Sequence, residues 1–214
     1  MSSTECASEN REQSSRTRWA LSVGDLTQAA VFAALIAALG LPGTISIGPS
    51  GVPITLQTLG VMLAGAILGW RKGALAIVLF AFLAIAGLPI LAGGRSGLVS
   101  LTSPTAGFFV GWLPAVIVIG VLTATMMPRY RTVLGIVINI VGGMGVIYLF
   151  GTIGLLLRTD LSWWAALSTN GIYVTGDVAK AVVTALVARQ VHRGYPGLIT
   201  PIRIRRTTDT AVHG

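Results

Sequence analysis

The chain has 214 residues, of which 53% are hydrophobic and only 10% are charged. An ordinary soluble domain has about 25% charged residues, so this composition excludes a water-soluble protein and indicates an integral membrane protein. The net charge of +8 does not indicate nucleic-acid binding, because the basic residues are scattered in small groups along the chain. The chain has a single cysteine, Cys6, in its amino-terminal tail, and its two histidines lie near the carboxy terminus. We therefore expect no disulfide framework, no metal site and no cofactor.

Six apolar segments of roughly membrane-spanning length follow one another in the sequence. We therefore predict an all-α membrane protein, a bundle of six transmembrane helices. The predicted domains are a disordered cytoplasmic tail at 1–24, the membrane domain at 25–193 and a basic cytoplasmic tail at 194–214. The predicted spans are Leu26–Leu41, Ile54–Trp70, Gly73–Leu91, Gly107–Met127, Val133–Leu157 and Gly171–Val191.

In the first span, alanine recurs every four residues in two neighbouring rows. Small residues at this spacing let another helix approach closely, because close van der Waals contact must drive helix association in lipid. Each row either packs inside this protein or binds a partner, and periodicity alone does not decide between the two. The first row is Ala29, Ala33 and Ala37, and the second is Ala30, Ala34 and Ala38.

Polar and glycine-containing features lie between and within the next spans. Residues 44–53 are uncharged and rich in Gly and Pro, which predicts a loop. Gln57, just inside the second span, forms either an interhelical hydrogen bond or part of a pocket. The long connection at 88–105 is too apolar for a linker, which favours a lid over a site, and its Arg95 faces either that site or solvent. Glycines at 142, 143 and 145 predict close packing or a kink in the fifth span.

The last span carries Asp177 and Lys180 as the only charges in its apolar run before Arg189. Three residues apart on a helix, the two side chains project from nearly the same face. A charge at the centre of a membrane helix costs at least about 2.5 to 3.5 kcal/mol, so such residues usually face a cavity or a charged partner. They form either a mutual ion pair that merely permits insertion or, as we prefer, part of a substrate site.

The distribution of Lys and Arg predicts the orientation in the membrane. Twelve of the fifteen lie in the two tails and in two short turns on one side, whereas Arg95 and Arg158 lie on the other side. By the positive-inside rule, both termini are cytoplasmic. Asp177 and Lys180 then lie in the outer half of the membrane, on the same side as Arg95. We expect a pocket of net charge +1, open to the outside and suited to an anionic ligand that also donates hydrogen bonds.

Motifs of enzymatic chemistry are missing from the sequence. It has no P-loop, no HExxH and no GxSxG motif. Asp177 also has no intramembrane carboxylate partner of the kind an aspartyl protease needs. We therefore predict a binding or transport protein and not an enzyme. The residues alone leave open a proton-coupled secondary transporter of a small organic anion, with Asp177 as the proton relay.

Four segments, taken in their order and spacing, resemble the BioY family, the biotin-specific substrate-binding components of energy-coupling factor (ECF) transporters. The resemblance covers about residues 25–193. The segments are PITLQTLGVMLAGAILGWRKGALA (Pro53–Ala76), GLPILAGGRSG (Gly87–Gly97), SPTAGFFVGW (Ser103–Trp112) and GDVAKA (Gly176–Ala181).

The resemblance implies a cell-membrane protein that captures biotin from outside and works with a transmembrane coupling subunit and a pair of ABC ATPases. It assigns substrate binding to Asp177, Lys180 and Arg95, and it assigns docking on the coupling subunit to one of the two alanine rows. Biotin offers a carboxylate to the cations and a cyclic urea whose N–H groups can donate to a carboxylate. Because the third span has no Asn or Gln, Gln57 or the backbone at 92–94 would replace an amide there.

Overall fold

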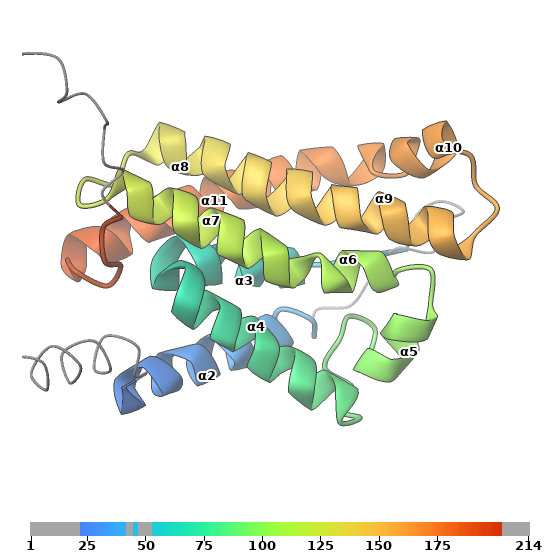
Figure 1. Ribbon diagram of the computed structural model, residues 1–214, viewed down its shortest axis with the longest axis horizontal. Coiled ribbons are helices and arrows are strands. Elements are labelled where there is room, and N and C mark those ends of the chain that lie inside the picture. The colour runs from blue at the N-terminus through green and yellow to red at the C-terminus, as the bar shows by residue number, and fades with distance from the viewer. Residues whose placement is uncertain (1–21, 42–44, 47–52, 203–214) are drawn as a thin grey trace, which may run out of the picture.

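The computed structural model describes residues 22–41, 45–46 and 53–202, and within them the chain is a bundle of helices (Figure 1). The all-α class is therefore confirmed. The predicted tails fall mostly outside these residues, at 1–21 and 203–214. The helices are α2 (Val23–Ala38), α3 (Gln57–Leu63), the π-helix η1 (Ala64–Leu68), α4 (Gly69–Ile85), α5 (Gly97–Thr102), α6 (Ala106–Val110), α7 (Trp112–Met126), α8 (Thr132–Asn139), the π-helix η2 (Ile140–Gly145), α9 (Val146–Arg158), α10 (Trp163–Ser168) and α11 (Gly171–Gly194).

Four helical stretches in the described part of the chain are long and apolar enough to cross a membrane, and α2 is a shorter apolar helix. The stretch Gln57–Ile85 covers most of the second and third predicted spans, which form a hairpin. The chain reverses at Gly69, whose φ of 77° is strained for other residues. Past the turn, α4 lies so close to η1 that a Cβ on Gly73 would be 2.9 Å from the Ala64 carbonyl oxygen. Figure 1 shows α2 beginning and α11 ending at the same end of the bundle, as an even number of crossings requires.

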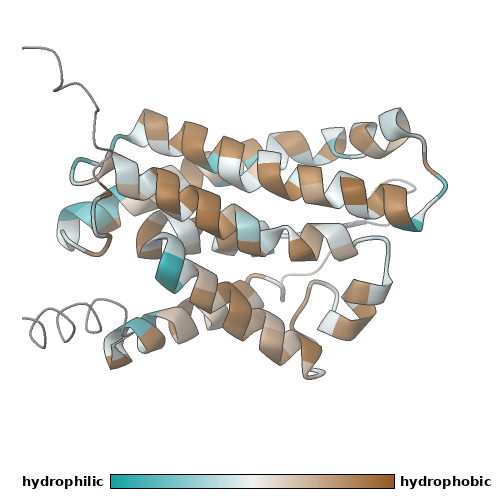
Figure 2. Cartoon of the chain, viewed as in Figure 1, coloured by the Kyte–Doolittle hydropathy of each residue, from teal (hydrophilic) through white to brown (hydrophobic). Residues whose placement is uncertain are grey.

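Hydrophobic residues cover the lengths of the helices, and hydrophilic residues gather toward the ends of the bundle (Figure 2). One buried apolar cluster joins α2, α4 and α7 through Ile36, Phe80 and Trp112. A second cluster includes Met62 and Ile119. Two short strands, β1 (Ile45–Ser46) and β2 (Pro53–Ile54), pair antiparallel in the segment predicted as a plain loop.

The glycines of the fifth span allow the close packing that the sequence predicts. They belong to η2, where the helix widens to a π-helical turn. A Cβ on Gly142 would lie 2.6 Å from Ile119 Cγ1, and a Cβ on Gly143 would lie 2.6 Å from Met62 Cε. A larger residue at 142 would require Ile119 to shift, and one at 143 would displace the end of the Met62 side chain.

The two alanine rows of α2 face in different directions. In the first row, Ala29 and Ala33 are buried and Ala37 is partly buried, so this row packs against the bundle. The second row is exposed along its whole length and consists of Ala30, Ala34 and Ala38. Internal packing and an outward-facing surface therefore exist together on one helix.

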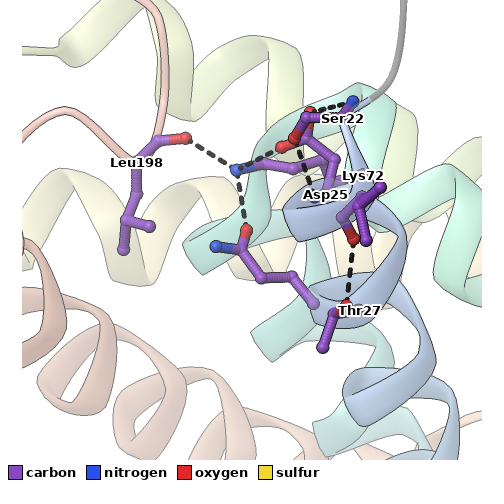
Figure 3. Close-up of polar contacts among 7 residues, drawn as sticks. Ser22, Asp25, Thr27, Lys72 and Leu198 are labelled. Atoms are coloured by element: carbon purple, nitrogen blue, oxygen red, sulfur yellow. Dashed lines mark hydrogen bonds and ion pairs between the residues drawn. The ribbon is translucent and has the colours of Figure 1, made fainter.

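A polar cluster at the end of the bundle predicted to be cytoplasmic ties α2 to α4 and to the chain after α11 (Figure 3). Lys72 Nζ donates to Gln28 Oε1 at 2.9 Å and to the Leu198 carbonyl at 3.2 Å, and it lies 3.6 Å from Asp25 Oδ1. Ser22 and Asp25 form a capping box at the start of α2. One lysine thus connects three segments that are distant in the sequence.

Residues 195–202, part of the predicted carboxy-terminal tail, lie against the bundle. Ile199 is buried beside Gly69, and the Ile202 amide donates to the Ala124 carbonyl at 3.1 Å. This segment therefore fastens the end of α11 to α4 and α7.

Candidate ligand-binding site

A cavity opens between α3, α9, α11 and the chain that connects α4 to α7. Its empty space, counted out to the open mouth, is about 660 Å³. All four residues that the sequence predicts for substrate binding lie on its wall. The lining residues are Thr55, Gln57, Thr58, Leu91, Ala92, Arg95, Ser100, Thr105, Phe108, Phe109, Trp112, Ile147, Tyr148, Tyr173, Asp177 and Lys180.

Asp177 and Lys180 form a salt bridge on α11, with 2.8 Å between Lys180 Nζ and Asp177 Oδ1. Tyr148 on α9 donates to Asp177 Oδ2 at 2.7 Å, and Thr58 Oγ1 lies 3.4 Å from Oδ1. Lys180 also donates to the Thr55 carbonyl at 2.6 Å and to Thr58 Oγ1 at 3.0 Å. The predicted ion pair is therefore present, and it also lines a cavity, so the two interpretations drawn from the sequence do not exclude each other.

This network holds a buried carboxylate in one orientation. Asp177 is 6% exposed, and each of its oxygens has a donor from another helix or from Lys180. A buried charge pair is tolerated only when hydrogen bonds satisfy its remaining atoms. A carboxylate oxygen accepts more than one hydrogen bond, so Asp177 retains acceptor capacity for a ligand N–H group.

Arg95 lies on a tight loop between α4 and α5. The backbone groups of Leu91 and Arg95 pair with each other at 3.1 and 3.3 Å, and Gly93 and Gly94 turn the chain between them with φ values of 77° and 68°. Arg95 Nε donates to the Ala92 carbonyl at 3.2 Å. This bond helps to hold the guanidinium at the cavity wall.

The Arg95 guanidinium forms no salt bridge with a carboxylate among residues 22–41, 45–46 and 53–202. Partial burial lowers the pKa of the guanidinium below its ordinary value. Arginine nevertheless remains protonated in proteins. The cavity therefore combines a neutralised ion pair with a second, unmatched cation, which agrees with the net charge of +1 expected from the sequence.

Gln57 connects this loop to α2. Its Nε2 donates to the Ile36 carbonyl at 3.2 Å and to the Ile90 carbonyl at 2.9 Å, while its Oε1 accepts from the Ala92 amide at 2.9 Å. Both N–H groups of the amide are therefore engaged with backbone. Gln57 borders the cavity and also makes the interhelical hydrogen bonds that the sequence allowed as an alternative.

Aromatic residues of α6 and α7 form an apolar wall of the cavity. Trp112 packs edge-to-face on Phe109, with ring centroids 5.4 Å apart, and its other neighbour Phe80 lies at 5.6 Å. These contacts hold Trp112 in place, so the wall is preformed. Between the charged groups, the site therefore offers apolar contact surface.

Several cavity residues were not predicted from the sequence, above all Thr58, Ser100, Thr105 and Tyr148. Hydroxyl-bearing side chains are common in membrane helices, and no isolated charge marks these positions. Among them, only Thr58 could have been suspected from the sequence, because it directly follows Gln57.

Residues 11–197 match the family model described as BioY family. The chain belongs to the BioY family. It is 44% identical to the biotin transporter BioY of Rhizobium etli over 82% of this chain and 97% of that protein. It is 43% identical to the biotin transporter BioY of Rhodobacter capsulatus, again over 82% of this chain and over 96% of that protein.

A solved structure has the same fold. It is described as the crystal structure at 2.1 Å of the S-component for biotin from an ECF-type ABC transporter, and it superposes with a TM-score of 0.78 at 30% identity. The match covers 83% of this chain and 97% of the other chain. The resemblance noted in the sequence is therefore confirmed, and this BioY family member is a multi-pass membrane protein, a transporter component and not an enzyme.

Proposed function

We propose that this chain captures biotin at the outer face of the cell membrane as the substrate-specific component of an ECF-type ABC transporter. The observation that carries the proposal is the charge arrangement of the cavity. It holds one carboxylate that is already paired with a lysine, and one arginine that has no carboxylate partner among the described residues. The names of the relatives and of the solved structure supply the ligand.

The charge arrangement favours one orientation of biotin. Because Lys180 is matched by Asp177 at 2.8 Å, the ligand carboxylate gains most by lying next to Arg95. The cyclic urea then lies near α11, where Asp177 accepts from a urea N–H and Lys180 exchanges its bond to Thr58 Oγ1 for one to the urea oxygen. Charge-assisted hydrogen bonds of this kind are stronger than neutral ones.

Two further groups of residues fit this orientation. The apolar wall around Trp112 contacts the hydrocarbon part of the ligand between its polar ends. Gln57 acts through the loop, because its hydrogen bonds to Ile90 and Ala92 hold the backbone that carries Arg95. Gln57 is thus assigned to the binding site as a residue that positions the lid.

The partner surface in this proposal is the exposed alanine row of α2. Ala30, Ala34 and Ala38 face away from the bundle, and small residues allow a neighbouring helix to approach closely. The coupling subunit docks on this row, and the ABC ATPases supply the energy that this chain has no motif to provide. The inward-facing row of Ala29, Ala33 and Ala37 packs against the rest of the bundle.

Calorimetry on the purified full-length protein in detergent tests the binding step. We expect one biotin per chain to bind without any nucleotide. No heat of binding and no protection from thermal unfolding at saturating biotin would refute the proposal.

Reconstitution tests the transport step against a proton-coupled carrier. We expect ATP-dependent biotin uptake into proteoliposomes that contain this chain together with its coupling subunit and ATPases, and no effect of a protonophore. Uptake by this chain alone that a protonophore abolishes would instead identify a secondary transporter.

A further inference from the structure

Ser100 is a buried polar residue on the cavity wall with an unused hydroxyl. It lies on the short helix α5, is 2% exposed and lines the same cavity as Arg95. Its Oγ has no hydrogen-bond partner among the residues that the structure describes. Buried hydroxyls are satisfied in the large majority of cases, so this one requires an explanation.

The hydroxyls that surround Ser100 in the sequence are satisfied locally. Thr102 Oγ1 donates to the carbonyls of Leu98 and Val99, at 3.1 Å each. Ser103 Oγ donates to the Ser100 carbonyl at 2.8 Å. Serine on a helix commonly bonds to a carbonyl of the preceding turn in the same way, but Ser100 does not. The backbone of α5 therefore does not account for its hydroxyl.

The chain segment that carries Ser100 also supplies a cation to the cavity wall. Arg95 lies five residues earlier on the same connection between α4 and α6, and Leu91 and Phe108 are apolar residues of the same lining. A hydroxyl donor and a guanidinium that line one cavity suit an anionic oxygen, because a carboxylate accepts several hydrogen bonds at once.

We propose that the Ser100 hydroxyl donates a hydrogen bond to the ligand carboxylate that Arg95 neutralises, and that Ser100 is thereby a specificity-determining residue of the site. The inference rests on the proposed function, since it takes biotin as the ligand. It adds a neutral donor, on a different helix from Asp177 and Lys180, to the groups that select a ligand with a carboxylate.

Ser100→Ala tests the inference, with Thr102→Val as the matched control on the same helix. We expect Ser100→Ala to weaken biotin binding about tenfold, as loss of one hydrogen bond to a charged group does. Thr102→Val removes an exposed hydroxyl that is bonded within α5, and we expect it to leave the affinity unchanged. Affinities are measured by calorimetry on the full-length proteins in one detergent.

A second ligand identifies the group that Ser100 contacts. We expect Ser100→Ala and the wild type to bind a biotin analogue without the carboxyl group equally well, within about twofold. An equal loss of affinity for both ligands would overturn the assignment to the carboxylate.

Thermal unfolding of the ligand-free proteins separates binding from a structural role. Replacing an unpaired buried hydroxyl by a methyl hydrogen is neutral or stabilising, so the midpoint for Ser100→Ala should not fall. A lower midpoint, or unchanged biotin affinity in this variant, would overturn the inference. Absence of biotin binding by the wild type would instead count against the proposed function itself.

Discussion

Leucine substitutions at two adjacent alanines of α2 distinguish its inward-facing and outward-facing rows. Ala33 is 3% exposed and belongs to the same buried cluster as Val61 and Phe80. The larger side chain in Ala33→Leu must displace packed neighbours, and overpacking of this kind costs about 1–3 kcal/mol of folding free energy. Ala34 is exposed, so Ala34→Leu should change the folding free energy by less than about 0.5 kcal/mol.

Binding of the coupling subunit should be lost in Ala34→Leu and retained in Ala33→Leu, the reverse of their effects on stability. A leucine in the exposed row separates α2 from a docked helix and removes the close contact that small residues permit. We expect Ala34→Leu to abolish co-purification with the coupling subunit while biotin affinity and thermal stability stay at wild-type values. We expect Ala33→Leu to lower the unfolding midpoint in detergent, with co-purification retained at temperatures well below that midpoint.

Co-purification, calorimetry and thermal unfolding of both variants in one detergent check this reasoning. The result that would refute it is normal co-purification of Ala34→Leu. If Ala33→Leu failed to co-purify with the coupling subunit and yet kept the wild-type unfolding midpoint, docking would be assigned to the inward-facing row that contains Ala33.

Three further predictions concern hydrogen-bonded side chains. Asp177→Asn should weaken biotin binding about 10- to 150-fold, because it removes a charge-assisted hydrogen bond of about 1.5–3 kcal/mol. The control Asp160→Asn, at an exposed position, should leave the affinity unchanged. Equal calorimetric affinities of Asp177→Asn and the wild type would contradict the site. Gln57→Leu should lower both the unfolding midpoint and the biotin affinity, because it leaves the Ala92 amide unpaired at a cost of about 1–3 kcal/mol; unchanged affinity would show that the loop does not need this bond. Lys72→Met should lower the unfolding midpoint in detergent, by about 1 kcal/mol in free energy, and leave biotin affinity unchanged; a stability equal to wild type would show that the cluster contributes nothing.

The features that could be predicted from the sequence are those marked by a residue type that is rare in a membrane helix. Asp177 and Lys180 stand out in an apolar run because a charge there is costly, and the structure pairs them on a cavity wall. The two adjacent charges Arg71 and Lys72 indicated a hairpin turn for the same reason, and the structure places the reversal two residues earlier, at Gly69, with both charges in the first turn of α4. The glycines at 142 and 143 predicted close packing, and their contacts with Ile119 and Met62 confirm it.

Other features could not be predicted because the membrane removes the contrast on which sequence patterns depend. A helix in lipid is apolar on its buried and exposed faces alike, so the alanines at 33 and 34 look equivalent in the sequence. Thr58 and Tyr148 contact Asp177 across the bundle. In the sequence, Thr58 is 119 residues and Tyr148 is 29 residues from Asp177. The short α5 was missed as well, because six residues leave too little periodicity to recognise.

The three hydrogen bonds of Gln57 have a consequence for communication across the protein. This single amide holds the Ile36 carbonyl near the end of α2 and also the Ile90 carbonyl and Ala92 amide of the loop before Arg95. The loop before Arg95 and the end of α2 are therefore both bonded to one side chain on α3, and a displacement of that loop away from Gln57 would break the bonds to Ile90 and Ala92. Since α2 also carries the outward-facing alanines, the helix that presents the proposed docking surface and the loop that carries Arg95 are held in register by a single buried amide.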